Sequence, residues 1–201
     1  MKRTRRLLWG VLALAMAGSL LFYFIRSKPS IRPEHTAAPS AYGRVPDFTL
    51  TDAQNQPFGA AALHGRVWVA DFIFTSCAGQ CPLMTEQMRL LQQRLPAPVQ
   101  MVSITVDPDR DTPAVLARYA AEHGAQPGRW HFLTGDKTII QNLAMKGFHL
   151  GYAEGGPKEE PIVHSVRLIL VDSQGEIRGT YDGIDPASLD RLVQDAKMLT
   201  R

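Results

Sequence analysis

Two cysteines separated by three residues are the strongest chemical signal in this sequence of 201 residues. Cys77 and Cys81 stand in the segment Cys-Ala-Gly-Gln-Cys-Pro, and the chain has no other cysteine. Such a pair can form a disulfide or hold one soft metal ion between two thiolates. A framework of several disulfides and a four-cysteine zinc or iron–sulfur site are both excluded, because each needs more cysteines.

Several interpretations of the cysteine pair compete. An inert disulfide would close a very short loop and restrain little chain entropy, which favours a functional pair. Dithiol oxidoreductases of the thioredoxin type use two intervening residues, and the extra room here suits a metal ion better than rapid exchange. A thiol peroxidase would need a threonine near one attacking thiolate, and Thr75 is only a weak signal of that kind. Spacing alone leaves metal binding and redox exchange open.

The six histidines of the chain are the candidates for a third metal ligand. Two thiolates select soft ions, chiefly Cu(I), and imidazole is an acceptable third donor for copper. His164 begins a predicted strand that should run beside the one leading to Cys77, although its alternation with Val166 and Leu168 also fits a buried core histidine. The other histidines give no clear ligand signal: His35 in a proline-rich segment, His64 and His123 beside glycines, and His131 and His149 without an assignment.

Aspartates alternate in the segment that follows a second predicted strand, Asp107–Thr112. An EF-hand calcium loop would need Gly at its sixth position and Glu at its twelfth, where this chain has Thr112 and Arg118. We therefore interpret the segment as turn and helix-capping residues. Asp107, at the end of the strand, could still face the cysteine loop.

The elements that must position these residues alternate between strands and helices. Val67–Phe74 is a near-continuous apolar run, typical of a central strand covered on both faces, and Val99–Val106 is predicted as a second central strand. Pro82 suits the first turn of a helix that the apolar spacing extends to Leu95. The other predictions are strands at Asp47–Leu50, Trp130–Leu133, Ile162–Val171 and Glu176–Tyr181, and helices at 112–124, Asp136–Met145 and Asp185–Leu199.

This order predicts an α/β fold of the thioredoxin-like kind, with an N-terminal extension and an inserted helix. The sheet should be partly parallel, with helices on both faces and a C-terminal antiparallel hairpin. The cysteine pair lies where a strand ends and a helix begins, which is where reactive groups collect in open α/β sheets. A helix N-terminus also favours the thiolate over the thiol.

The N-terminal region predicts a membrane anchor before this domain. Residues 7–25 form an uncharged, mostly apolar run of 19 residues, about the length of a membrane-spanning helix. A cleaved signal peptide is the alternative, but the apolar run continues beyond its candidate cleavage site at Ala15–Ala17. Basic residues in 1–6 place the N-terminus in the cytoplasm and the domain outside. Residues 26–46 read as a proline-rich tether, and 47–201 as the folded domain.

Charge argues against a nucleic-acid partner. The net charge is +3, but residues 1–28 contribute six of the 22 basic side chains and none of the 19 acidic ones. The rest of the chain is therefore mildly acidic and has no basic footprint for DNA or RNA.

Four motifs in order resemble the Sco/SenC family over about residues 45–198: FIFTSCAGQCP, ITVDPDRDTP, LTGD and IVHSVRLILVDSQG. The resemblance implies a thioredoxin-like protein that binds copper through Cys77, Cys81 and His164 and assists assembly of the binuclear copper centre of cytochrome c oxidase. Asp107 matches a family position near that site. Ala78 stands where family members commonly have proline, which predicts a more flexible loop.

From this resemblance we expect a single-pass inner-membrane protein with a monomeric periplasmic domain that carries one copper ion. Its expected partners are the copper-centre subunit of the oxidase and another copper chaperone or thiol reductase. Cu(I), and also Cu(II), could be the bound state, and the oxidised pair would be a Cys77–Cys81 disulfide. Two alternatives stay open: a thiol–disulfide reductase, with Cys77 attacking and Cys81 resolving, and a copper or redox sensor. We also expect the loop 148–161 to become ordered when His164 binds metal.

Overall fold

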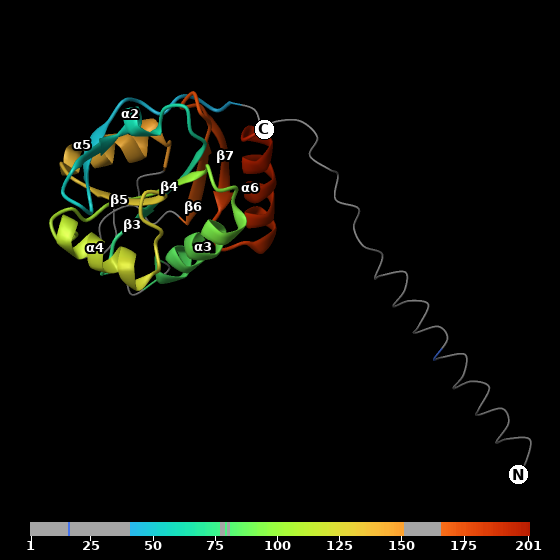
Figure 1. The fold of residues 1–201 in the computed structure, drawn as a ribbon, viewed down its shortest axis with the longest axis horizontal. Coiled ribbons are helices and arrows are strands. Elements are labelled where there is room, and N and C mark those ends of the chain that lie inside the picture. The colour runs from blue at the N-terminus through green and yellow to red at the C-terminus, as the bar shows by residue number, and fades with distance from the viewer. Residues whose placement is uncertain (1–15, 17–40, 77–78, 80, 151–165) are drawn as a thin grey trace, which may run out of the picture. The chain divides into compact units, whose positions relative to one another are not determined.

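Seven strands form one mixed sheet in the part of the chain that a computed structural model describes, namely Met16 and residues 41–76, 79, 81–150 and 166–201. Their order across the sheet is β2-β1-β5-β4-β3-β6-β7 (Figure 1). Strands β3, β4 and β5 are parallel, whereas the remaining neighbours pair antiparallel. The strands are β1 (Thr49–Asp52), β2 (Pro57–Gly59), β3 (Trp68–Ile73), β4 (Gln100–Thr105), β5 (Trp130–Thr134), β6 (Arg167–Val171) and β7 (Ile177–Asp182).

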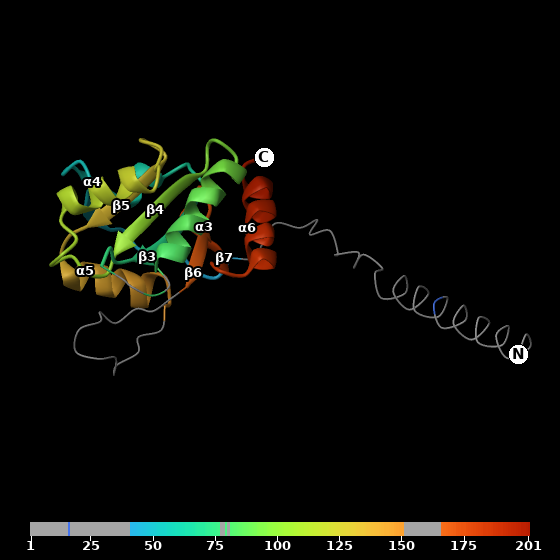
Figure 2. The same cartoon turned by 90° about the horizontal axis from the view of Figure 1, so that it is seen from below.

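Helices cover both faces of the sheet, as predicted (Figure 2). Apolar side chains of α3 (Cys81–Arg94), α4 (Pro113–Glu122) and α6 (Pro186–Leu199) join one core cluster. Those of α2 (Ala60–Leu63), α5 (Lys137–Asn142) and the π-helical turn η1 (Leu143–Gly147) join the other. Every residue of β3 and β4 is buried as a result, which explains why neither sequence alternates between buried and exposed positions.

Strand register brings three segment ends to one edge of the sheet. Strands β3 and β4 pair in parallel with Ile73 opposite Thr105, so both chains leave the sheet at this edge. Strand β6 runs antiparallel to β3, with Ala70 opposite Ile169, and therefore begins at the same edge. The segment leading to Cys77, the aspartate segment and the chain that follows His164 thus meet there.

Two short elements and one turn differ from the sequence prediction. Strand β2 and helix α2 were not expected, since three or four residues are too few to show periodicity. The predicted helix Asp136–Met145 is α-helical only as far as Asn142 and then continues to Gly147 as a π-helical turn, in which the Phe148 amide donates to the Leu143 carbonyl at 2.9 Å. Gly147 faces Pro46 here, and a Cβ atom would lie 2.9 Å from the proline Cδ.

The domain makes its first described contacts earlier than Asp47. The Tyr42 amide donates to the Ile177 carbonyl and the Val45 amide donates to the Gly175 carbonyl. This segment is therefore hydrogen-bonded to the β6–β7 hairpin. Val45 is buried in the core. Of the predicted anchor, residues 7–25, only Met16 is described, and no helix among the described residues has the length and hydropathy to cross a membrane.

Helix α6 depends on a side-chain cap at its first turn. Asp185 accepts hydrogen bonds from the amides of Ala187 and Ser188, at 3.2 and 2.9 Å. Asp185→Ala should lower the free energy of unfolding by about 1 kcal/mol, because these amides lose their acceptor. Urea titration followed by circular dichroism measures this change. Asp109→Ala is the control, since its carboxylate is 72% exposed and an exposed ion pair contributes little; an equal loss in both variants would contradict the role of the cap.

Candidate metal and dithiol site

Cys81 is the first residue of α3 and the one predicted ligand within the described residues. Its side chain is half-buried and packs against the core cluster that contains Phe72 and Phe74. The thiol therefore lies at the positive end of a helix of 14 residues, where the thiolate form is favoured. Cys77, Ala78 and His164 lie outside the described residues, as does most of the loop 148–161.

The chain that follows His164 has the predicted alternation. Leu168 and Leu170 are fully buried in the cluster beneath α3 and α6, and Val166 packs against the same cluster. Strand β6 begins only at Arg167, so the predicted strand at Ile162–Val171 is confirmed for its last five residues. The edge at which β6 starts is the edge to which β3 delivers the cysteine loop.

Among the other described histidines, His123 and His131 are half-buried, whereas His64 and His149 are exposed. The His131 ring stacks on Phe58 with centroids 4.3 Å apart, and its Nε2 lies 3.1 Å from Gln100 Oε1. Burial lowers the pKa of His131. His123 ends α4, and His64 is exposed. Within the described ranges, no three His, Cys, Asp or Glu side chains gather as a metal site.

Asp107 follows the end of β4 by two residues and is buried. Its Oδ2 accepts from Arg110 Nη1 at 3.4 Å, and its amide donates to Thr105 Oγ1 at 3.0 Å. Asp107 therefore lies at the edge of the sheet where β4 ends, and its role beside the metal ligands stays a prediction. Its contacts do not reach the described part of the cysteine loop.

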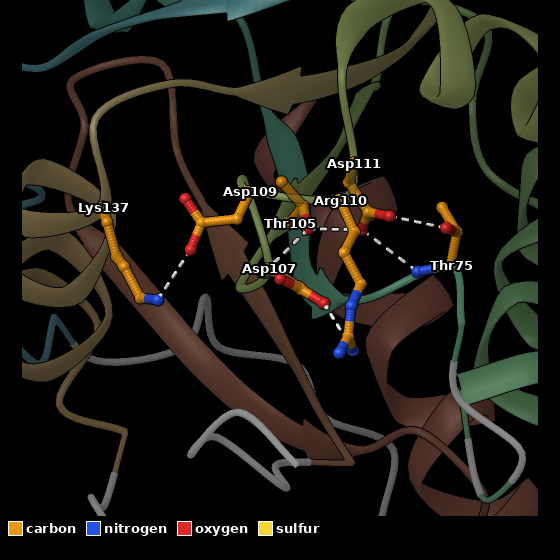
Figure 3. Close-up of polar contacts among 7 residues, drawn as sticks. All are labelled: Thr75, Thr105, Asp107, Asp109, Arg110, Asp111 and Lys137. Atoms are coloured by element: carbon orange, nitrogen blue, oxygen red, sulfur yellow. Dashed lines mark hydrogen bonds and ion pairs between the residues drawn. The ribbon is translucent and has the colours of Figure 1, made fainter. Parts of the chain in front are cut away.

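Asp111 makes the contact with the cysteine loop, although its sequence pattern predicts only a turn residue. Its carboxylate is fully buried and accepts from both the amide and the hydroxyl of Thr75 (Figure 3). The one sequence feature that could have drawn attention to Asp111 is its position directly before the Thr-Pro start of a helix. Because the Thr75 hydroxyl donates to Asp111, its proton is not offered to a peroxide, which counts against the peroxidase interpretation.

Ion pairs border this network on its exposed side. Lys137, at the start of α5, donates to Asp109 at 2.9 Å, and both side chains are solvent-exposed (Figure 3). Arg110, also exposed, pairs with Asp107. The exposed side of the segment after β4 therefore carries both signs of charge.

A second buried carboxylate, Asp71, lies in the middle of β3. Its Oδ1 accepts from Ser103 Oγ at 2.6 Å, and Ser103 in turn accepts from Trp130 Nε1 at 2.9 Å. Oδ2 has no hydrogen-bond partner among the described residues. Burial raises the pKa of Asp71 to about 7, more than the bond from Ser103 lowers it.

Comparison with known proteins decides the family. The SCO1/SenC sequence model matches residues 36–201, which is nearly all of the described domain. The chain belongs to the SCO1/SenC family. The SCO1 homologue of Bacillus subtilis is 33% identical over 157 residues, covering 76% of this chain and 81% of its own.

Solved structures agree with the Sco fold. BsSco, a member of the Sco family of cytochrome c oxidase assembly proteins in which a disulfide switch was identified, is 30% identical with a TM-score of 0.72, over 82% of this chain and 98% of its own. Yeast Sco1 with copper bound is 26% identical with a TM-score of 0.63, over 77% and 89%. The predicted thioredoxin-like α/β fold and the resemblance to the Sco/SenC family are thus confirmed.

Proposed function

We propose that this Sco protein binds one copper ion through Cys77, Cys81 and His164 and delivers it to the binuclear copper centre of cytochrome c oxidase. The observation that carries the proposal is the edge of the sheet where Cys81 begins α3, β3 ends and β6 starts. The family, and the copper bound in the solved structure of yeast Sco1, support copper binding.

The three proposed ligands suit copper as the ion that is carried. Two thiolates and an imidazole match the preference of Cu(I) for soft and borderline ligands. Both cysteines must be reduced before copper can bind, so the redox state of the pair controls loading. Ala78 is expected to leave the loop more flexible than proline would. This flexibility affects the affinity for copper and not which residues bind it.

The proposal includes a location and partners. Residues 7–25 would anchor the chain in the inner membrane, residues 1–6 would stay in the cytoplasm and the domain would face the periplasm or an equivalent space. The copper-centre subunit of the oxidase would receive the ion by ligand exchange. A thiol reductase or another chaperone would reduce or load the pair, and the domain would act as a monomer.

A second candidate is a thiol–disulfide reductase for the cysteines of a partner. The position of Cys81 at a helix N-terminus favours it, because thiolate character promotes exchange. The disulfide switch identified in BsSco points in the same direction. Both candidates use the same pair of cysteines and differ in their need for His164.

Anaerobic Cu(I) titration of the reduced full chain in mild detergent, with a competing chelator, tests the proposal. The wild type should bind one equivalent, whereas Cys77→Ser and Cys81→Ser should each weaken binding by more than about 100-fold, because a thiolate ligand is removed. The oxidised chain should not load. Tight binding by either serine variant would refute the ligand assignment, and weak binding by the wild type would refute the carrier function.

A further inference from the structure

Asp111 connects the segment after β4 to the segment after β3. It is fully buried, and its own amide donates to the Asp107 carbonyl at 2.9 Å, so the loop that holds it is closed on itself. Thr112 then caps α4 through a bond from the Val115 amide. The backbone of Asp111 is therefore fixed by the loop before it and by the capped helix after it, independently of its side chain.

The carboxylate of Asp111 accepts three hydrogen bonds from described residues. The Thr75 amide donates to Oδ2 at 3.0 Å, the Thr75 hydroxyl donates to Oδ1, and the Thr105 hydroxyl donates to Oδ2 (Figure 3). Hydrogen bonds to an ionised acceptor are shorter and stronger than those between neutral groups. Thr75 is thus bound at both its backbone and its side chain.

The position of these bonds follows from the strand ladder. The last rung between β3 and β4 is the bond from the Val106 amide to the Ile73 carbonyl, at 2.8 Å. The register makes the Thr75 amide the next donor of β3, but the other chain turns away at Asp107-Pro108. Asp111 supplies the acceptor in place of that missing rung, and so holds the chain two residues before Cys77.

We infer that Asp111 is a positioning residue for the dithiol site, which sets the spacing of Cys77 relative to Cys81. This inference rests on the proposed copper function. Cys81 is held by α3 and by the core cluster, whereas the approach to Cys77 is held at Thr75. Loss of the Asp111 side chain removes the hydrogen bonds at Thr75 and leaves the packing of Cys81 in place. Polar groups that orient metal ligands typically contribute about 10- to 100-fold to affinity.

The experiment compares Asp111→Ala with Asp136→Ala in the full chain. Asp136 is an exposed aspartate that caps α5 through a 3.0 Å bond from the Ile139 amide, so it controls for the loss of an aspartate that accepts a local bond without a contact to Thr75. Thr75→Val removes one of the two bonds to Asp111, and Thr75→Ser retains both. Cu(I) affinity by chelator competition, the iodoacetamide alkylation rate of each cysteine without copper, and the melting temperature are measured for every variant.

Asp111→Ala should lower Cu(I) affinity by about 10- to 100-fold. Without copper it should raise the alkylation rate of Cys77 relative to Cys81 by at least about fivefold, because it removes both bonds at Thr75 and the loss of one alone corresponds to about that factor. Thr75→Val should show smaller changes of the same sign, and Thr75→Ser and Asp136→Ala should retain wild-type values. The inference is overturned if Asp111→Ala lowers only the melting temperature, or if Asp136→Ala changes affinity and alkylation equally.

The two proposals can fail separately. If the wild-type chain binds no copper, the carrier function fails, and the alkylation ratio still decides whether Asp111 positions the pair. If the wild type binds copper and Asp111→Ala retains both its affinity and its alkylation ratio, the carrier function stands and the role of Asp111 is refuted. A variant that does not fold is replaced by Thr75→Val, which leaves the carboxylate in place.

Discussion

Replacement of His164 by alanine should lower the affinity for Cu(I) by more than about 100-fold, while the exchange of the cysteine pair with a small disulfide stays within about threefold of wild type. The physical reason is that copper needs the imidazole as a ligand, whereas thiol–disulfide exchange needs only the two sulfurs. This variant therefore separates the carrier from the reductase. Chelator competition measures the first quantity and stopped-flow exchange measures the second.

His64→Ala is the matched control for this variant. His64 is exposed and lies beside Gly65 in a turn at the opposite end of β3 from the cysteine loop. It should retain both wild-type affinity and wild-type exchange. A His164→Ala protein that still binds copper tightly would remove His164 from the ligand set. The cysteine pair would then be better interpreted as a redox couple, and its reduction potential would be the next quantity to determine.

Asp71→Asn should stabilise the protein increasingly as the pH rises from 4 to 8. In the folded chain, burial raises the pKa of Asp71 from 3.8 to about 7, so between these values the native carboxyl holds a proton that the unfolded chain has released. Stability must therefore fall with rising pH across this window, by about 1.4 kcal/mol per unit at most. The asparagine keeps an acceptor for Ser103 and does not ionise.

Urea unfolding at pH 4, 6 and 8 measures this effect. The gain in unfolding free energy over wild type should be small at pH 4 and reach at most about 4 kcal/mol at pH 8. Asp47→Asn is the control, because Asp47 is exposed, and its difference from wild type should not depend on pH in this range. A constant difference for Asp71→Asn across the three pH values would show that Asp71 is already ionised in the folded protein at low pH.

Much of the fold is readable from local sequence because its central elements are long and covered on both sides. The mostly apolar run around β3 and the helical spacing of α3 are each long enough to identify the element from its sequence. Elements of three or four residues, such as β2 and α2, carry no period, and they form because the hairpin and its neighbours position them. The π-helical turn at Leu143–Gly147 ends at Gly147 against Pro46, about a hundred residues earlier in the chain, and no local pattern indicates this contact.

The candidate ligands follow from residue type and from motifs that this family shares, so the sequence by itself determined Cys77, Cys81 and His164 as the predicted set. It also determined the family and the class of fold. What only the tertiary structure decided is how buried polar groups are used. Asp111 reaches Thr75 across 36 residues, and Asp71 is held by Ser103 across 32. Neither contact has a local pattern, because a buried carboxylate takes its donors from whichever strands and loops the sheet brings beside it.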